Sequence, residues 1–146
     1  MENGLGQENT LSYSTRVART RPGSSVNCKS KRCQNVVDSL EHALVDCQSN
    51  DGVGIILLNF IRRFMPGLQT ESMLRLEIHA DEDLELPFVF LISTVLSCVW
   101  NLRVSGSRVQ KYLVRSQLEA KINLLRETRY FPAADKLEEF TLSMFD

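Results

Sequence analysis

The sequence lacks the short motifs that accompany the commonest kinds of enzyme chemistry. It contains no GxxxxGK[ST] phosphate-binding loop, no GxGxxG dinucleotide fingerprint and no G-x-S-x-G nucleophile elbow. It has two histidines, and one of them, His79, precedes an acidic loop without a second metal-ligand pair beside it. We therefore expect a protein that is not an enzyme and that has no small-molecule substrate.

The sequence also lacks a segment suited to export or to membrane insertion. The first seven residues are polar and include no apolar stretch of the signal-peptide kind. The longest apolar run, 84–102, only approaches the roughly 20 residues that a bilayer requires, and it includes Glu85, Pro87 and Asn101. We expect this run to form a buried core helix, with no membrane partner, in a protein of the nucleus or cytoplasm.

Alternation of apolar and polar residues is missing over any useful length, and so are internal repeats, which predicts an all-α fold. Asp51 is a candidate cap for the second helix, the acidic loop 81–85 precedes Pro87 as a first helical residue, and Gly106 permits a bend. After a short helix that Asp38 or Ser39 can cap, the expected helices cover about 51–66, a short stretch from Thr70, 87–102, 107–129 and 133–144.

Cysteine and histidine, although few, are concentrated in one short segment. Three of the four cysteines and one histidine follow the pattern C-x4-C-x8-H-x4-C, with Cys28, Cys33, His42 and Cys47 as its members. Thiolate and imidazole are the ligands that zinc prefers, and a closed structural site uses four of them. In an intracellular setting such a cluster indicates metal more often than disulfides. The alternative is that these residues are ordinary small apolar cysteines and a surface histidine.

The spacing between the last two candidate ligands imposes a condition on the backbone. On a regular α-helix His42 and Cys47, five residues apart, would point about 140° away from each other. We therefore predict that the helix loosens before Cys47 if both residues bind one ion.

Basic residues are concentrated in two parts of a chain whose net charge is only −1. Residues 1–37 carry six basic and two acidic side chains, and residues 102–130 carry seven and two. Basic side chains that form a patch can neutralise phosphates. The alternative is that they are simply solvated. The candidates for phosphate contacts are Lys29, Lys31, Arg32, Arg108, Lys111 and Arg115.

These features predict three segments. Residues 1–25, rich in Gly, Asn, Ser, Thr and Arg, form a disordered basic arm. Residues 26–48 form a short zinc knuckle, and residues 49–146 form a helical domain.

The Cys/His segment and the string Asp38-Ser-Leu-Glu-His-Ala-Leu-Val-Asp-Cys47 resemble the C-terminal zinc-binding segment of LINE-type (non-LTR) retrotransposon reverse transcriptases. The likeness extends over about 26–130. It includes the strings Leu57-Leu-Asn-Phe-Ile-Arg-Arg-Phe-Met-Pro-Gly67, Leu74-Arg-Leu-Glu77, Glu85-Leu-Pro87, Val109-Gln-Lys-Tyr-Leu-Val-Arg-Ser-Gln-Leu-Glu-Ala120 and Leu124-Leu-Arg-Glu-Thr-Arg129.

The resemblance implies a domain that lies downstream of a polymerase and helps it to hold template RNA or target DNA. It assigns the zinc ligands to the four members of the Cys/His pattern. The Tyr-x-Asp-Asp pair of a polymerase is missing from this sequence, as is an endonuclease domain. We therefore expect a non-catalytic, zinc-dependent nucleic-acid-binding module, a fragment or remnant of such an element, with RNA or DNA and a reverse transcriptase domain as its candidate partners.

A second hypothesis from the sequence is a helical protein-interaction scaffold that binds no nucleic acid. It would dock its acidic segment 71–85, or an apolar helix face, on a polymerase domain or on another partner.

Overall fold

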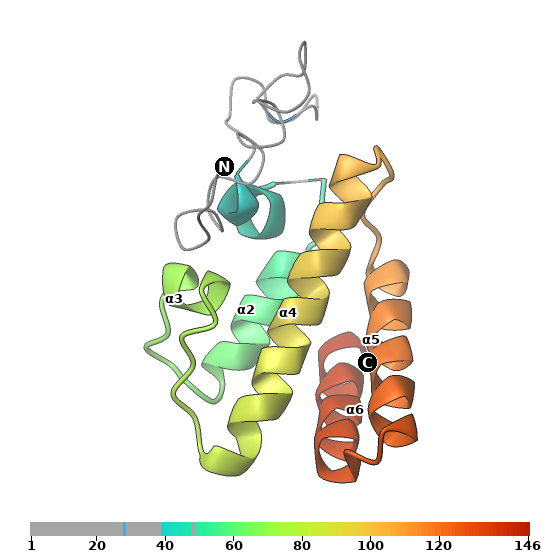
Figure 1. The fold of residues 1–146 in the computed structure, drawn as a ribbon. Helices are drawn as coiled ribbons and strands as arrows, with labels where there is room; N and C mark the ends of the chain where they lie inside the picture. The colour runs from blue at the N-terminus through green and yellow to red at the C-terminus, as the bar shows by residue number, and fades with distance from the viewer. Residues whose placement is uncertain (1–27, 29–38, 48) are drawn as a thin grey trace, which may run out of the picture.

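The computed structural model describes Cys28, residues 39–47 and residues 49–146. These residues form helices joined by turns, with no strand among them, which confirms the all-α prediction (Figure 1). The predicted basic arm and much of the predicted knuckle lie outside the described residues. The elements are a π-helical turn η2 (His42–Asp46) and the α-helices α2 (Val53–Arg62), α3 (Thr70–Leu74), α4 (Glu82–Val104), α5 (Lys111–Glu127) and α6 (Phe131–Phe145).

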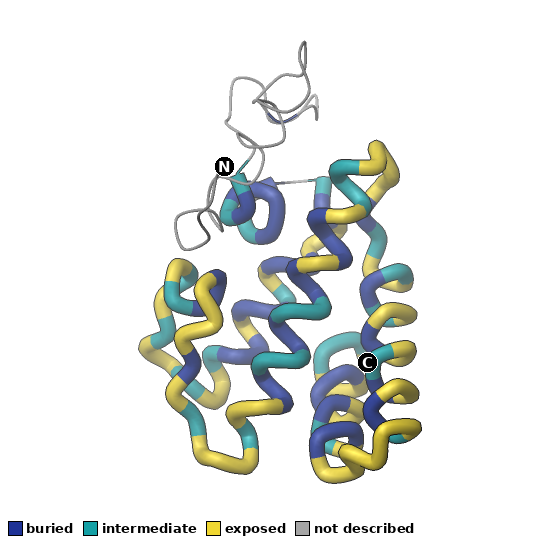
Figure 2. Tube along the Cα trace, in the orientation of Figure 1, coloured by how far each residue is buried: buried dark blue, intermediate teal, exposed yellow. Residues whose placement is uncertain are grey.

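Helix α4 is the central element of the fold. It contacts η2, α3, α5 and α6, and nine of its residues are buried (Figure 2). By length and composition α4 could cross a bilayer, but the core helix of a folded domain meets the same description. Its contacts on several sides agree with the expectation of a core helix.

The start of α4 differs from the prediction. We expected an acidic loop at 81–85 and a helix that begins at Pro87, but the helix begins at Glu82 and Pro87 lies inside it. Glu82, Asp83 and Glu85 therefore occupy the first turn, where carboxylates interact favourably with the helix dipole. This gain offsets the hydrogen bond that the proline cannot donate.

The end of α4 is set by Gly106, as its bend-forming role predicts. Gly106 has a φ of 79° and donates its N–H to the carbonyl of Arg103, while Ser107 donates to the carbonyl of Leu102. This pair of bonds is a Schellman motif, which favours glycine at the left-handed position. Consequently α5 begins at Lys111, later than the predicted residue 107.

The prediction that Asp51 caps the second helix is wrong. Gly52 is the N-cap residue of α2, whereas the Asp51 carboxylate accepts the backbone N–H of Lys111 at 2.9 Å. The acidic side chain therefore stabilises the first turn of α5, sixty residues away in the sequence.

An aromatic cluster joins α2, α4 and α6 at the end of the core opposite η2. Phe88 of α4 stacks on Phe140 of α6 with ring centroids 4.7 Å apart, and Phe60 of α2 packs edge-on against Phe140 at 5.3 Å. Phe64 contacts all three rings. Such pairs add to the free energy gained from burial of the rings alone.

Candidate metal centre

Three of the four predicted ligands come together at one end of the molecule. The ligand atoms of Cys28, His42 and Cys47 all lie within 4.8 Å of one another, and the three residues are buried. Cys33, the fourth predicted ligand, lies outside the described residues. A ligand set of two thiols and an imidazole, brought together across nineteen residues of sequence, could hold a metal ion.

The backbone loosens where the spacing required it. Residues 42–46 form a π-helical turn, and Cys47 donates its N–H to the carbonyl of His42 at 2.7 Å. A bond between residues i and i+5 brings His42 and Cys47 close to the same side of the turn, which an α-helix would not do. Ser39 starts this segment, as predicted, by accepting the N–H of His42 on its hydroxyl at 3.2 Å.

The two sulfur atoms are close but are not bonded to each other. The Sγ atoms of Cys28 and Cys47 lie 3.8 Å apart, whereas a disulfide bond is about 2.0 Å long. The pair therefore keeps the thiol or thiolate form that a metal ion requires.

The imidazole of His42 is a second observation that fits a metal centre. The residue is 5% exposed, and among the described residues neither Nδ1 nor Nε2 has a hydrogen-bond partner. Burial of an unsatisfied polar group costs free energy, on the order of 1–3 kcal/mol. Coordination of a metal ion by one ring nitrogen would remove part of this cost, so the residues present fit such a group.

A positively charged side chain from the helical domain, Arg103, donates hydrogen bonds to both sulfur atoms of the centre. Arg103, in the last turn of α4, donates from Nη1 to the sulfur of Cys47 at 3.3 Å and from Nη2 to the sulfur of Cys28 at 3.2 Å. Burial acts to raise the pKa of Cys47, but hydrogen bonds from the Ser49 backbone and from Arg103, with the charge of Arg103, outweigh it and lower that pKa. A lowered thiol pKa favours the thiolate, which is the form that binds metals.

Cys98 shows the opposite environment. It lies in the interior of α4, and burial raises the pKa of its thiol. This agrees with the sequence pattern, which leaves Cys98 outside the Cys/His cluster.

Two residues that the sequence analysis missed hold the π-helical turn in place. Asn50 is buried, and its Nδ2 donates to the carbonyls of Ala43 and Leu44. Gly54 of α2 lies so close to the turn that a Cβ added to it would overlap the carbonyl of Leu44. An Asn-x-x-x-Gly pattern after a cysteine is too common to have signalled either role.

The predicted phosphate-binding residues are only partly placed by the structure. Lys29, Lys31 and Arg32 lie outside the described residues. Arg108 and Lys111 are exposed near the start of α5, whereas Arg115 forms an ion pair with Asp146 at 2.8 Å and a weaker one with Glu119 at 3.4 Å. Hydrogen bonding and attraction to Asp146 raise the pKa of Arg115. The positive charge of this helix is therefore partly compensated within the molecule.

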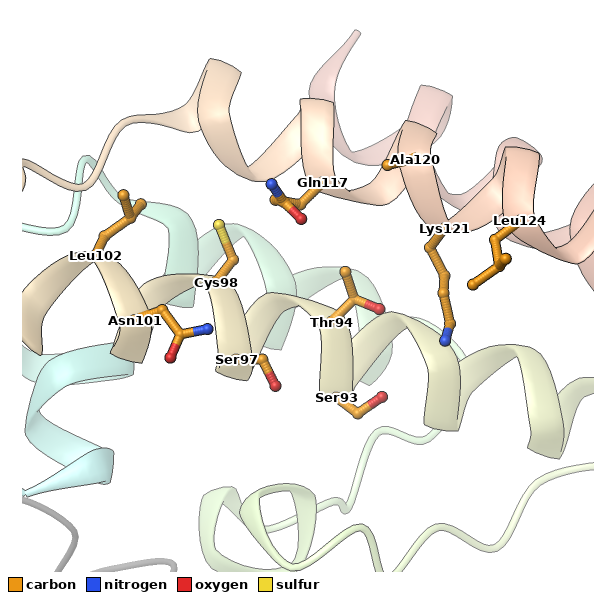
Figure 3. Close-up of a pocket in the computed structure, with 10 residues that line it drawn as sticks. All are labelled: Ser93, Thr94, Ser97, Cys98, Asn101, Leu102, Gln117, Ala120, Lys121 and Leu124. Atoms are coloured by element: carbon orange, nitrogen blue, oxygen red, sulfur yellow. The ribbon is translucent and has the colours of Figure 1, made fainter. Parts of the chain in front are cut away.

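A groove lies between α4 and α5 (Figure 3). Its volume is about 500 Å³, and it is lined by serine, threonine and amide side chains with Lys121 at one end. None of the lining residues is a histidine or a carboxylate.

Comparison of the chain with protein-family models, with curated proteins and with solved structures finds no match.

Proposed function

We propose that this chain is a zinc-dependent nucleic-acid-binding module of the kind that follows the reverse transcriptase in LINE-type retrotransposons. The observation that carries the proposal is the buried group of Cys28, His42 and Cys47. We assign the fourth ligand to Cys33, as the sequence pattern implies. Four protein ligands make a closed site, in which zinc stabilises the fold and does no chemistry.

The distance between the sulfurs is compatible with zinc. Zinc–sulfur bonds of about 2.3 Å at tetrahedral angles place two sulfurs about 3.8 Å apart. The sulfurs of Cys28 and Cys47 are 3.8 Å apart. Little rearrangement of these two ligands would then accompany zinc binding.

The nucleic-acid part of the proposal rests on where the basic residues fall in the sequence. Lys29, Lys31 and Arg32 lie between two of the assigned ligands, so a bound zinc would hold them in one short turn. Ammonium and guanidinium groups on a restricted backbone can contact phosphates without a further loss of backbone entropy. Arg108 and Lys111, which are exposed, would add to the same interaction.

Zinc content is the first test. We expect close to one zinc per chain by elemental mass spectrometry of protein purified without chelator, and loss of that zinc in the Cys47→Ala and His42→Ala variants. Cys98→Ala is the matched control, because it removes a buried thiol outside the centre. A folded wild-type chain without zinc would overturn the metal site.

Salt dependence of RNA binding is the second test. Replacement of Lys29, Lys31 and Arg32 by alanine should reduce the slope of log K against log salt by about 2, because each lost contact to a single strand contributes roughly 0.7. Lys136→Ala is the control, since Lys136 is already paired with Glu139 at 3.0 Å on α6. A slope near zero for the wild-type chain would contradict nucleic-acid binding while leaving the zinc site intact.

The second candidate function, a protein-interaction scaffold, is favoured by the ion pairs between α5 and α6. Arg126 pairs with Glu138 at 2.6 Å and with Asp135 at 3.4 Å, in addition to the pairs of Arg115. These pairs reduce the charge that the helix can offer to phosphates. Purified chain that self-associates in sedimentation experiments, but shifts neither RNA nor DNA in a gel, would favour this candidate.

A further inference from the structure

Arg103 connects the candidate metal centre to the helical domain through both cysteine sulfurs. One guanidinium group donates to Cys47 and to Cys28, at 3.3 and 3.2 Å, from the last turn of α4. The two cysteines lie 56 and 75 residues before it in the sequence. No sequence pattern indicated this contact.

The fork of the guanidinium suits this position better than an ammonium group would. Its N–H donors are fixed in one plane and can serve two acceptors at once, whereas a lysine presents a point charge on a flexible stem. Three thiolates around a divalent ion would also leave one net negative charge, which the guanidinium would compensate in a partly buried site.

The end of α4 fixes the backbone position from which this side chain extends. Gly106 closes the Schellman motif directly after the last turn, and the residues before it, Val99 and Trp100, are buried. The backbone position of Arg103 is therefore fixed at the end of a buried helix, and from there its side chain reaches the two sulfurs.

We infer that Arg103 is the positioning residue of the zinc centre: it donates one N–H to each of two thiolate ligands and so couples zinc loading to the placement of Cys28 and Cys47 at the end of α4. This inference rests on the proposed zinc site. The role of Arg103 goes beyond the proposed zinc site, because a zinc knuckle can fold by itself without a hydrogen-bond donor from a neighbouring helical domain.

The test compares zinc affinity in the full chain and its Arg103 variants. Competition with a chromophoric chelator should show a 10- to 100-fold weaker affinity in Arg103→Ala, the range found when outer-shell partners of metal ligands are removed. Arg103→Lys keeps the positive charge but lacks the planar pair of N–H donors, so its zinc affinity should lie between those of the wild type and Arg103→Ala. Arg75→Ala, which removes an exposed arginine paired with Glu71, should leave the affinity unchanged.

Cobalt substitution provides a readout that a general loss of stability would not change. In Arg103→Ala loaded with Co²⁺ the thiolate-to-cobalt charge-transfer band should shift to lower energy, because the sulfurs lose hydrogen bonds that withdraw electron density. The d–d bands should stay in the range of a tetrahedral site.

The outcomes separate this inference from the proposed function. A wild-type chain that binds no zinc removes both. Equal zinc affinity and an unchanged cobalt spectrum in wild type and Arg103→Ala overturn the role of Arg103 but leave the zinc site. If Arg103→Ala does not fold, Arg103→Lys decides: affinity and spectrum equal to wild type would overturn the role of the fork.

Discussion

Two cysteines of this chain have the same side chain but opposite acidity, and the difference comes from their neighbours. Cys47 has a cationic donor and a backbone N–H at its sulfur, and its pKa is lowered in spite of burial. Cys98 is about as buried but has no cation at its sulfur, and its pKa is raised by burial. Residue type and burial therefore do not separate a ligand thiol from a core thiol, whereas the hydrogen-bond donors do.

The raised pKa of Cys98 leads to a prediction about alkaline stability. The pKa of Cys98 in the folded state lies above its value in the unfolded state. The contribution of the protonated thiol to the free energy of unfolding is therefore fully present below the unfolded-state pKa, and it is lost as the pH rises through the folded-state pKa. The free energy of unfolding, measured in urea at a series of pH values, should decrease above the ordinary thiol range in wild type and decrease less in Cys98→Ala. Identical pH profiles for the two proteins would show that burial does not perturb this thiol.

Asn50 leads to a prediction about the turn that carries two ligands. Asn50→Ala should lower the free energy of unfolding by about 1–3 kcal/mol, because the buried carbonyls of Ala43 and Leu44 lose a donor. Asn50→Asp should cost more, since a carboxylate can only accept and would face those two carbonyl oxygens. Asn123→Ala, at an exposed position, should change stability by less than about 0.5 kcal/mol. Equal stability of the Ala and Asp variants, from urea titrations, would contradict the donor role.

At the scale of elements, the contact between η2 and α2 decides the geometry of the site. The turn packs on the start of α2, where Val53 and Gly54 are buried, and the overlap that a Cβ would cause at Gly54 shows how near the two backbones approach. The carbonyls of Ala43 and Leu44 in this turn accept hydrogen bonds from the side chain of Asn50, which precedes α2. Helix α2 therefore restricts the backbone of the π-helical turn that carries His42.

Glycine substitutions test this contact. Gly54→Ala should destabilise the protein by about 1–3 kcal/mol, the cost of overpacking a filled site, and should also weaken zinc binding. Gly67→Ala is the matched control, because a Cβ there would meet nothing within 4 Å and Gly67 is not at a left-handed position. Chemical denaturation and zinc titration of the two variants provide the comparison. Equal stabilities would mean that η2 moves away from α2 at little cost.

The sequence predicted some elements well and others poorly, for identifiable reasons. The core helix and the role of Gly106 followed from an apolar run and a glycine placed after it, which are local signals. The predicted start of that helix was wrong because acidic residues before a proline are compatible with either a loop or the first turn of a helix. The cap role of Asp51 was wrong because its partner, Lys111, is distant in sequence.

The candidate site also has features that the sequence predicted and features that it did not. The need for a loosened helix between His42 and Cys47 followed from angular spacing alone, and the π-helical turn confirms it. The roles of Arg103, Asn50 and Gly54 depend on contacts between separate elements. A single sequence carries no signal for such contacts, so the sequence could predict the candidate ligands but not the residues that hold them in place.

At the scale of the whole molecule, residues 40–44 and the helices share one hydrophobic core, beside which Cys28 and Cys47 form a small cluster of their own. Leu40, Ala43 and Leu44 belong to the same buried cluster as residues of α4, α5 and α6. Packing of this kind predicts that the segment is ordered together with the helical domain. The predicted division at residue 48 therefore stays a prediction, and Leu40, Ala43 and Leu44, which precede it, pack into the same core as the helices that follow it.

This shared core leads to a prediction for metal removal. A ligand that binds only the folded state stabilises it by about 4 kcal/mol at a thousand times its dissociation constant, which for a chain of this size corresponds to a rise in Tm of roughly 10 °C. We expect the zinc-loaded protein to melt higher than the chelator-treated protein by about this amount, in a single transition followed by circular dichroism at helical wavelengths. Cys47→Ala should melt at one temperature with or without zinc, whereas Cys98→Ala should keep the full shift. The contrary result would be two transitions: a small one that depends on zinc, and the melting of the helices at an unchanged temperature. It would mean that the metal segment unfolds independently and that its contacts with α4 contribute little to the stability of the core.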